Sequence, residues 1–273
     1  MENRERLDSL LQGCGVRLWG ACDFNPLAGR LLSCRAKARI PEKAASVLCA
    51  AFPYRSREPL RNVSYYAVVP DYHSVLLPVL RAAAGRLSEA FAGYAFEPFV
   101  DNSPIPEVYA AAMCGLGIVG DNGLLITPEY GSWVFLGEIV TDLPLFAGQQ
   151  PVQTCPHCGR CRAACPGGAL TGSKMEKSRC LSHLTQKKGT LSGEEAALVQ
   201  KGELVWGCDR CQEVCTLNRG VKETDFPPFQ EGRIPFLRTG DAARLTGRAF
   251  GWRPPEVIER NLRLLPSKDE RLP

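Results

Sequence analysis

Eight of the thirteen cysteines in this 273-residue chain lie between Cys155 and Cys215. In a small secreted protein such a density indicates disulfides, but in a cytosolic chain of this length it indicates metal or redox chemistry. The remaining five cysteines are scattered, and we expect them to be small buried hydrophobic side chains. These are Cys14, Cys22, Cys34, Cys49 and Cys114.

The first cysteine run is Cys155-x2-Cys158-x2-Cys161-x3-Cys165, followed by Pro166. This is the spacing of bacterial ferredoxins, in which three cysteines hold one [4Fe–4S] cube and the fourth reaches across to another. A tight loop can direct three thiolates at three iron corners of one cube. The fourth corner must then be met from elsewhere in the chain.

The second run, Cys208-x2-Cys211-x3-Cys215, supplies three cysteines, and two cubes need eight ligands. Cys180 lies between the runs and is the expected eighth. We therefore expect two clusters. One would be held by Cys155, Cys158, Cys161 and Cys215, and the other by Cys165, Cys180, Cys208 and Cys211.

Three other interpretations of this segment compete. Zinc uses paired CxxC knuckles, but a four-cysteine x2-x2-x3 run is poor zinc spacing. A disulfide scaffold conflicts with the expected compartment. A degenerate module that has lost its clusters keeps the same sequence. His157, inside the first run, is expected to be a surface side chain that hydrogen-bonds near a cluster rather than a ligand.

The expected cellular compartment follows from the targeting signals that the sequence lacks. No apolar stretch of signal-peptide length follows Met1, and no run approaches the length that spans a bilayer. We expect a soluble cytoplasmic protein with no membrane partner. The formal net charge of +4 permits an anionic partner but does not require one.

Hydrophobic periodicity predicts strands that alternate with helices in residues 1–150, which indicates an α/β layer domain. Pro128–Gly131 resembles a hairpin turn between the last two strands. The expected helices span 3–12, 72–92 and 106–113, and the expected strands span 16–21, 44–52, 122–127 and 132–140.

A proline-bounded linker, Pro144–Thr154, precedes a ferredoxin-like domain expected over residues 151–220. Within it, Ser192 and Glu195 form the capping-box pattern of a helix over 192–201. Residues 221–273 are expected to form a C-terminal extension whose last helix, about 255–265, packs on the core.

Several segments, in collinear order, resemble the epoxyqueuosine reductase family. They are DYH at 71–73, FVDNSP at 99–104, GLG at 115–117, GSWVFLGE at 131–138, TDLPL at 141–145, RCLSHLT at 179–185 and GCD at 207–209. The match covers most of the chain, and the combination is specific although no single piece is.

The resemblance implies a cobalamin-binding-like front domain beside two [4Fe–4S] clusters, and an enzyme that reduces epoxyqueuosine to queuosine in tRNA. It implies that Asp101, in the family's VD-S-P segment, donates the proton and contacts cobalamin. It also implies a low-potential electron donor, flavodoxin or ferredoxin. Further cobalamin contacts are expected in the neighbourhood of Asn122, Leu125, Ser132, Gly137 and Ser182.

The implied chemistry constrains Asp101. An epoxide oxygen leaves as an alkoxide unless an acid protonates it, whereas an aspartic acid in water is ionised at neutral pH. Asp101 is therefore expected to be an acid only in a closed, apolar pocket that raises its pKa. The alternative is a turn-forming aspartate before Asn102. His73 is expected to be a structural histidine, and no protein histidine is expected on the cobalt.

Two departures from the family weaken the case for tRNA. Ala67–Pro70 replaces a basic segment, and Asp121 replaces a lysine, and both changes remove charge that phosphates would attract. We expect a short family member that lacks the C-terminal helical repeats. The basic residues near the cysteines fit either RNA or an acidic electron donor. They are Arg160, Arg162, Lys174, Lys177, Arg179, Lys187 and Lys188.

Three functions follow from these observations. The leading one is an epoxyqueuosine reductase that acts on tRNA or a smaller fragment. The second is a corrinoid iron–sulfur reductase of another small molecule. The third is a non-enzymatic ferredoxin-type electron carrier whose front domain docks a partner.

Overall fold

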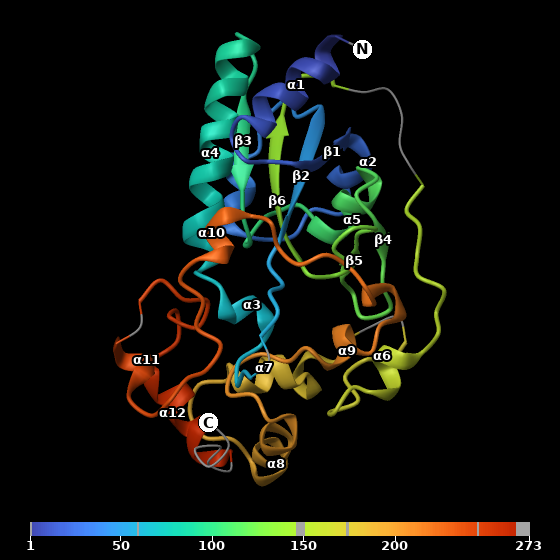
Figure 1. Ribbon diagram of the computed structural model, residues 1–273. Helices are drawn as coiled ribbons and strands as arrows, with labels where there is room; N and C mark the ends of the chain where they lie inside the picture. The colour runs from blue at the N-terminus through green and yellow to red at the C-terminus, as the bar shows by residue number, and fades with distance from the viewer. Residues whose placement is uncertain (1, 59, 146–150, 173–174, 245, 266–273) are drawn as a thin grey trace.

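The computed structural model describes the chain except for residues 1, 59, 146–150, 173–174, 245 and 266–273 (Figure 1). Its front half contains a four-stranded sheet in the order β1-β2-β6-β3. The strands are β1 (Leu18–Asp23), β2 (Ser46–Pro53), β3 (Phe96–Phe99) and β6 (Val134–Thr141). Every neighbouring pair is antiparallel, so the mixed fold is of the α+β kind.

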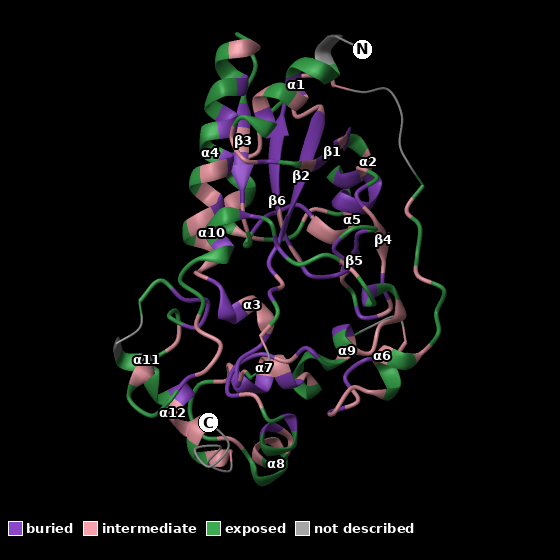
Figure 2. Cartoon of the chain, in the orientation of Figure 1, coloured by how far each residue is buried: buried purple, intermediate pink, exposed green. Residues whose placement is uncertain are grey.

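Helices cover both faces of this sheet. α1 (Glu2–Gln12) and α4 (Tyr72–Ala90) pack on one face, where Leu11, Leu80 and Phe52 share a hydrophobic core. α2 (Asn25–Ala28) and α5 (Glu107–Met113) pack on the other. Every residue of β2 is buried, and the strands form the buried centre of the front half (Figure 2).

The turn predicted at Pro128–Gly131 is present, because Thr127 and Gly131 exchange two backbone hydrogen bonds, but the prediction that the flanking strands pair as a hairpin is wrong. β5 (Leu125–Ile126) pairs with β4 (Ile118–Val119), which was not predicted, and β6 pairs with β2 and β3 instead. Gly117 explains the close approach of the short strands, because a Cβ there would lie 2.3 Å from the Ile126 carbonyl oxygen.

The cysteine segment lies at one end of the sheet and contains only short helices (Figure 1). These are α6 (Arg160–Ala163), η2 (Lys177–Arg179), α7 (Leu181–Thr185), α8 (Gly193–Gly202), α9 (Arg210–Glu213) and η3 (Thr216–Asn218). The predicted capping box of α8 is confirmed, with Glu195 N–H donating to Ser192 Oγ and Ser192 N–H donating to Glu195 Oε2.

After the cysteine segment the chain packs back against earlier parts of the molecule. Phe226 and Phe229, at α10 (Pro227–Gln230), join the core against the sheet. α12 (Pro255–Leu264) packs against Trp206 and α3 (Tyr65–Val68). The remaining short helices are η1 (Arg35–Arg39) and α11 (Asp241–Arg244).

The domain boundaries at 150 and 220 stay predictions, and part of the expected linker lies outside the described residues. None of the helices in the described part of the chain is both long enough and apolar enough to cross a membrane.

Candidate functional site

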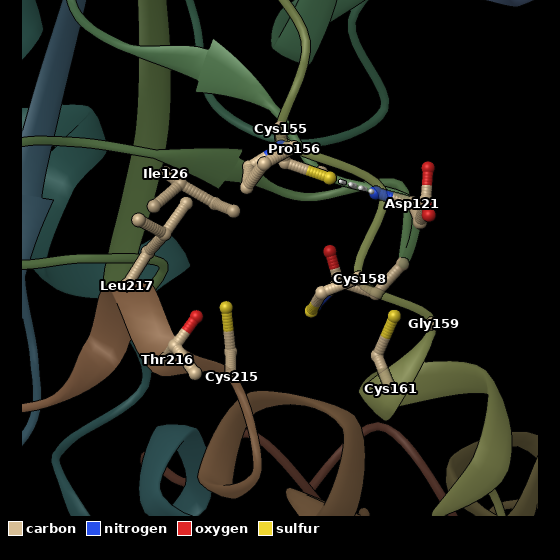
Figure 3. A pocket seen from close by; sticks show the side chains of 12 residues that line it. Asp121, Ile126, Cys155, Pro156, Cys158, Gly159, Cys161, Cys215, Thr216 and Leu217 are labelled. Atoms are coloured by element: carbon tan, nitrogen blue, oxygen red, sulfur yellow. Dashed lines mark hydrogen bonds between the residues drawn. The ribbon is translucent and has the colours of Figure 1, made fainter.

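Four cysteines predicted to share one cluster line a single cavity of about 360 Å³, the cysteine hollow. Figure 3 shows the sulfur atoms of Cys155, Cys158, Cys161 and Cys215 arranged around this common space. Gly159 permits the tight loop, because its φ of 73° lies in the left-handed region. The structure thus brings together thiols from the two runs that the sequence assigned to one cube.

The other four cysteines also gather. Burial raises the pKa of Cys208 to about 11, and the nearby Cys180 and Cys165 raise it further. Burial likewise raises the pKa of Cys211 to about 12, with added contributions from Cys208 and Cys180. Buried thiols of this kind ionise when a positive metal centre binds them. The donor set and the hollow therefore fit two iron–sulfur cubes.

A buried ion pair fixes the second run against the front domain. Asp209 is 1% exposed, and its carboxylate lies 2.9 Å from Nη1 of Arg61 and accepts from the Tyr65 amide. Burial raises the pKa of Asp209 to about 6, while Arg61 opposes the rise. Removal of one partner would leave the other charge buried and unpaired.

A buried polar network joins the turn before β6 to the second run. The Ser132 hydroxyl donates to Gln212 Oε1 at 2.9 Å and accepts from Asn218 Nδ2 at 2.9 Å. The Ser132 amide donates to Asn218 Oδ1 at 2.8 Å. This network holds the segment just after Cys215 beside the sheet.

Asp101 lies in the loop after β3 and pairs with a histidine. Its Oδ2 is 2.9 Å from Nε2 of His73, whose Nδ1 lies 2.7 Å from Oδ1 of Asp71. The hydrogen bond to Asp101, followed by the one to Asp71, raises the pKa of His73 to about 9. His73 is therefore an imidazolium at neutral pH, held between two carboxylates.

The structure does not meet the condition that the sequence set for Asp101 as an acid. That condition was a closed, apolar pocket that raises its pKa, but its side chain is 56% exposed. The hydrogen bond from His73 instead lowers its pKa, against a smaller effect of burial. Asp101 is ionised at neutral pH because a cation lies beside it.

Asp101 borders a second cavity of about 1130 Å³, the Asp101 hollow. Glu107 and Cys34 also line it. Cys34 is partly exposed, as are Cys14 and Cys114, so the expectation that all five scattered cysteines are buried is confirmed only for Cys22 and Cys49. The loop at Asp101 and Asn102 has positive φ values of 49° and 37°, a strained geometry typical of functional loops.

One thin wall separates the two hollows. Val119 and Gly123 line the Asp101 hollow, whereas Gly120, Asp121 and Asn122 line the cysteine hollow. The wall is the β4–β5 turn, closed by the hydrogen bond from Gly120 N–H to Leu124 O at 2.9 Å. Electrons that leave the cysteine hollow would have to cross only this turn.

Of the predicted cobalamin contacts, Asn122 lines the cysteine hollow, whereas Ser182 lines neither hollow. Asn122 is 8% exposed, and its side-chain nitrogen has no hydrogen-bond partner among the described residues. It also lies near Cys211 and opposes the rise in the pKa of that thiol. Ser182, in α7, accepts a hydrogen bond from Gln186 Nε2 at 3.4 Å. Their contact with cobalamin stays a prediction.

The other three predicted cobalamin contacts have protein neighbours. Leu125 is 2% exposed and belongs to the core under α5. Ser132 belongs to the buried network above. A Cβ at Gly137 would lie 2.6 Å from Cδ1 of Leu80, so glycine there lets α4 pack on β6. Their role as cofactor contacts likewise stays a prediction.

His157 is exposed and hydrogen-bonds beside the cysteine hollow, as predicted. Its Nδ1 lies 2.6 Å from Oδ1 of Asp121, and its Nε2 lies 3.1 Å from Oγ1 of Thr154. The Asp121 amide donates to Cys155 Sγ at 3.4 Å. Asp121, which stands where the family has lysine, thus orients the first cysteine loop.

Sequence reasoning missed two glutamates. Glu107 lines the Asp101 hollow, and Glu138 is 1% exposed inside β6. The signal was present for Glu138, because a carboxylate within the apolar run 133–140 is unusual for a buried strand. For Glu107 no sequence signal distinguished it from an ordinary first-turn glutamate.

Two family models match this chain. Residues 35–102 match the family described as "Epoxyqueuosine reductase QueG, DUF1730". Residues 154–218 match the 4Fe-4S double cluster binding domain. The second match spans all eight clustered cysteines, so this segment is a double [4Fe–4S] cluster domain, while the pairing of its ligands stays a prediction.

Curated relatives of similar sequence are also epoxyqueuosine reductases. The epoxyqueuosine reductase of Listeria monocytogenes is 36% identical over 204 residues, which cover 70% of this chain and 53% of the relative. That of Escherichia coli is 36% identical over 194 residues, covering 69% and 51%. The chain thus spans about half the length of the curated relatives it matches.

Solved structures share the fold. The epoxyqueuosine reductase of Streptococcus thermophilus matches with a TM-score of 0.80 at 26% identity, over 97% of this chain and 80% of that one. An epoxyqueuosine reductase with a tRNA-Tyr epoxyqueuosine-modified stem loop matches with a TM-score of 0.81 at 27% identity, over 96% and 80%. A reductive dehalogenase matches with a TM-score of 0.51 at 16% identity, over 96% and 36%, and shows a shared fold alone.

Proposed function

Because this chain resembles the epoxyqueuosine reductases in sequence and in fold, we propose that it is a cobalamin- and iron–sulfur-dependent oxidoreductase that reduces epoxyqueuosine to queuosine in tRNA. The observation that carries the proposal is the placement of Asp101 at a large hollow only one turn away from the four-cysteine hollow. Proton chemistry and electron storage thus lie side by side.

The reaction sets what the site must supply. An epoxide accepts two electrons and two protons and gives an alkene and water. When bound, the clusters would pass single electrons from an external low-potential donor to the corrin cobalt, which supplies the reducing chemistry at the epoxide. The chain's own residues have to orient the substrate, exclude water and provide the protons.

The His73–Asp101 pair can provide one of these protons. His73 carries a proton at neutral pH, and its Nε2 lies 2.9 Å from Asp101 Oδ2. A proton that moves from Nε2 to Asp101 and then to the leaving oxygen would prevent a free alkoxide from forming. Asp101 can therefore act as the acid although its own pKa is low, because His73 supplies the proton.

The loop that carries Asp101 fits such a role. A solved Bacillus subtilis epoxyqueuosine reductase has its catalytic aspartate loop swung out of the active site. We propose that the loop from Val100 to Ser103 is the matching element here. Its two left-handed residues, Asp101 and Asn102, are strained and exposed, which suits a loop that moves between two arrangements.

tRNA and the electron donor belong to this proposal as partners. Arg160, Arg162 and Lys188 lie on the cysteine segment with exposed side chains, where phosphates or an acidic donor could contact them. Lys187 is paired with Glu195 at 2.7 Å and Arg179 with Glu176 at 3.6 Å, so both are less available. Lys174 lies outside the described residues.

A second candidate is a corrinoid reductase of another small molecule. The fold shared with a reductive dehalogenase favours it only at the level of architecture. The same loaded protein can be offered an epoxyqueuosine-modified tRNA stem loop and an aryl halide in parallel. Turnover of the halide alone would favour the second candidate.

The test of the first candidate uses protein loaded with iron, sulfide and cobalamin without oxygen. Asp101→Asn should keep the cofactors and lose turnover of the modified stem loop by about 100-fold or more. Asp225→Asn, a surface carboxylate paired with Arg17, serves as the control and should turn over like the parent. Parental turnover in Asp101→Asn would remove Asp101 from the mechanism.

A further inference from the structure

Glu138 is a buried carboxyl group in the central part of the sheet. It lies in β6 opposite Cys49 of β2 and Phe99 of β3. Its side chain is 1% exposed, and neither carboxyl oxygen has a hydrogen-bond partner among the described residues. It shares the α5 face of the sheet with Val140, two residues along the strand.

Such a group is expensive to ionise. A buried carboxylate normally pairs with a cation or accepts several hydrogen bonds. In the described part of the chain, no arginine or lysine forms an ion pair with Glu138. Burial, and then the nearby Glu107, raise the pKa of Glu138 well above its usual value, so it is a neutral acid at pH 7.

Glu107 connects Glu138 with the Asp101 hollow. It is the first residue of α5 and lines the hollow beside Asp101, and its buried Oε1 has no partner among the described residues. Burial, with a further contribution from Asp101, raises the pKa of Glu107 to about 7. Glu107 is thus half protonated near neutral pH.

We propose that Glu138 and Glu107 form an internal proton store that delivers the second proton of the reaction to Asp101. This inference rests on the proposed function, because an epoxide reduction consumes two protons and the His73–Asp101 pair holds one. The store lies behind the hollow, where a closed substrate complex would block direct access of water.

The steps balance. After Asp101 has given its proton to the leaving oxygen, it is a carboxylate again. The O–H bond of Glu107 breaks as an O–H bond forms on Asp101, and Asp101 passes this second proton to the same oxygen, which leaves as water. The proton of Glu138 replaces the one that Glu107 has lost. The store and His73 each regain one proton from water when the hollow reopens. The electrons come from the low-potential donor.

Several groups of the described residues face the store. From β2 comes Cys49, from the loop after β3 come Asp101 and the Ser103 hydroxyl, and from α4 come Tyr72 and His73. The Asp101 carboxylate disfavours a negative charge on both glutamates, whereas the Ser103 hydroxyl favours it on Glu138, and His73 and the Asp101 backbone favour it on Glu107. Burial outweighs the favourable contacts, so Glu107 loses its proton as the pH rises through about 7, while Glu138 keeps its proton above that pH.

The direct test is infrared difference spectroscopy of the loaded protein across a pH titration. A protonated buried carboxyl gives a carbonyl stretch that shifts in D₂O. We expect this band in the parent at pH 7 and its loss in Glu138→Gln. The control is Glu97→Gln, a glutamate of β3 paired with Arg39 at the surface, in which the band should persist.

Turnover provides the second readout. In the parent, turnover of the modified stem loop should decline as the pH rises through about 7. Glu107→Gln should lower the rate at pH 6 by about 10-fold or more and remove this decline, because the titrating group is gone. If Glu107 had only a structural role, replacing it with glutamine, which has nearly the same shape, would leave the pH profile of turnover unchanged.

The outcomes separate the inference from the proposed function. The inference would be overturned if the parent shows no carbonyl band of a protonated carboxyl group, or if this band persists in Glu138→Gln as it does in Glu97→Gln. It would also be overturned if Glu107→Gln keeps the rate and the pH profile of the parent. If Glu138→Gln does not fold, Glu107→Gln at the rim decides alone. If the parent itself does not turn over the stem loop, the proposed function fails, and the infrared band still decides whether the pair stores a proton.

Discussion

His73 decides what Asp101 can do. An isolated aspartate on an exposed loop is a poor acid at neutral pH, and here the adjacent imidazolium holds its pKa even lower. The same contact places a proton 2.9 Å from the carboxylate. The proton donor that we propose is therefore the pair of residues rather than Asp101 alone.

The pair has a definite effect on stability. Since the folded pKa of His73 is raised to about 9 from 6.5, its stabilisation is fully present below about pH 6.5 and is lost as the pH rises through 9. Since the pKa of Asp101 is lowered from 3.8, the aspartate contribution is lost as the pH falls below about 4.

His73→Gln should therefore lower the heat-denaturation midpoint most between about pH 4 and 6.5. The side chains are about half exposed, so the loss in free energy of unfolding should be about 1 kcal/mol or less. The difference from the parent should vanish above about pH 10. A difference that stays constant across this range would contradict the ion pair.

Residues close in sequence were predictable, and residues joined by the fold were not. The cysteine spacing indicated both groups of thiols, because a ferredoxin loop fixes three ligands locally. His73 and Asp101 are 28 positions apart, and only the packing of α4 beside β3 brings them together. Glu107 influences the pKa of Glu138 for the same reason, because α5 packs on the face of the sheet that contains β6.

Among the elements, long periodic helices and buried strands were predicted well. The predicted helix over 72–92 is α4 (Tyr72–Ala90), and the predicted strand over 44–52 is β2 (Ser46–Pro53). The turn at Pro128–Gly131 led to a wrong prediction of strand pairing, because a favourable local turn does not decide which strands pair. β6 finds longer partners in β2 and β3 than β5 could offer.

The network at Ser132 makes an element-level prediction. Asn218→Ala leaves the Ser132 amide and the Gln212 carbonyl without their partner, which should cost about 1–3 kcal/mol. Because Cys215 lies three residues before Asn218, iron should also be lost faster to a chelator. Heat denaturation measures the loss of stability, and the rate of iron release to the chelator measures the loss of iron.

Lys222→Ala is the matched control for this change. Lys222 pairs with Glu129 at 2.5 Å in the same region, but both side chains are exposed. The heat-denaturation midpoint should stay close to that of the parent, with iron release unchanged, because solvent screens an exposed ion pair. An equal effect of the two variants would show that the buried network is not special.

At the scale of the molecule, the two halves are stabilised differently. The front half has two large hydrophobic cores around the sheet. In the described part of the cysteine segment, Leu181, Leu184 and Val199 form a small separate cluster of buried apolar side chains. Metal binding contributes directly to folding in segments with so little core.

Removal of iron should therefore unfold the cysteine segment first. After chelation, trypsin should cut at Arg160, Arg162 and Lys188, while the fragment that carries the sheet resists digestion. Mass spectrometry of the fragments checks this expectation. Equal resistance of the loaded and chelated proteins would mean that the segment folds without its clusters.

We propose that this chain combines two iron–sulfur clusters with cobalamin at one reductive site. The iron, sulfide and cobalt content of protein purified without oxygen from cells supplied with cobalamin, together with its EPR spectrum, tests this proposal. We expect about eight irons and one cobalt per chain, with a base-off cob(II)alamin signal, since no protein histidine is expected on the metal. Eight irons without cobalt would contradict the corrinoid reductase and leave an electron carrier.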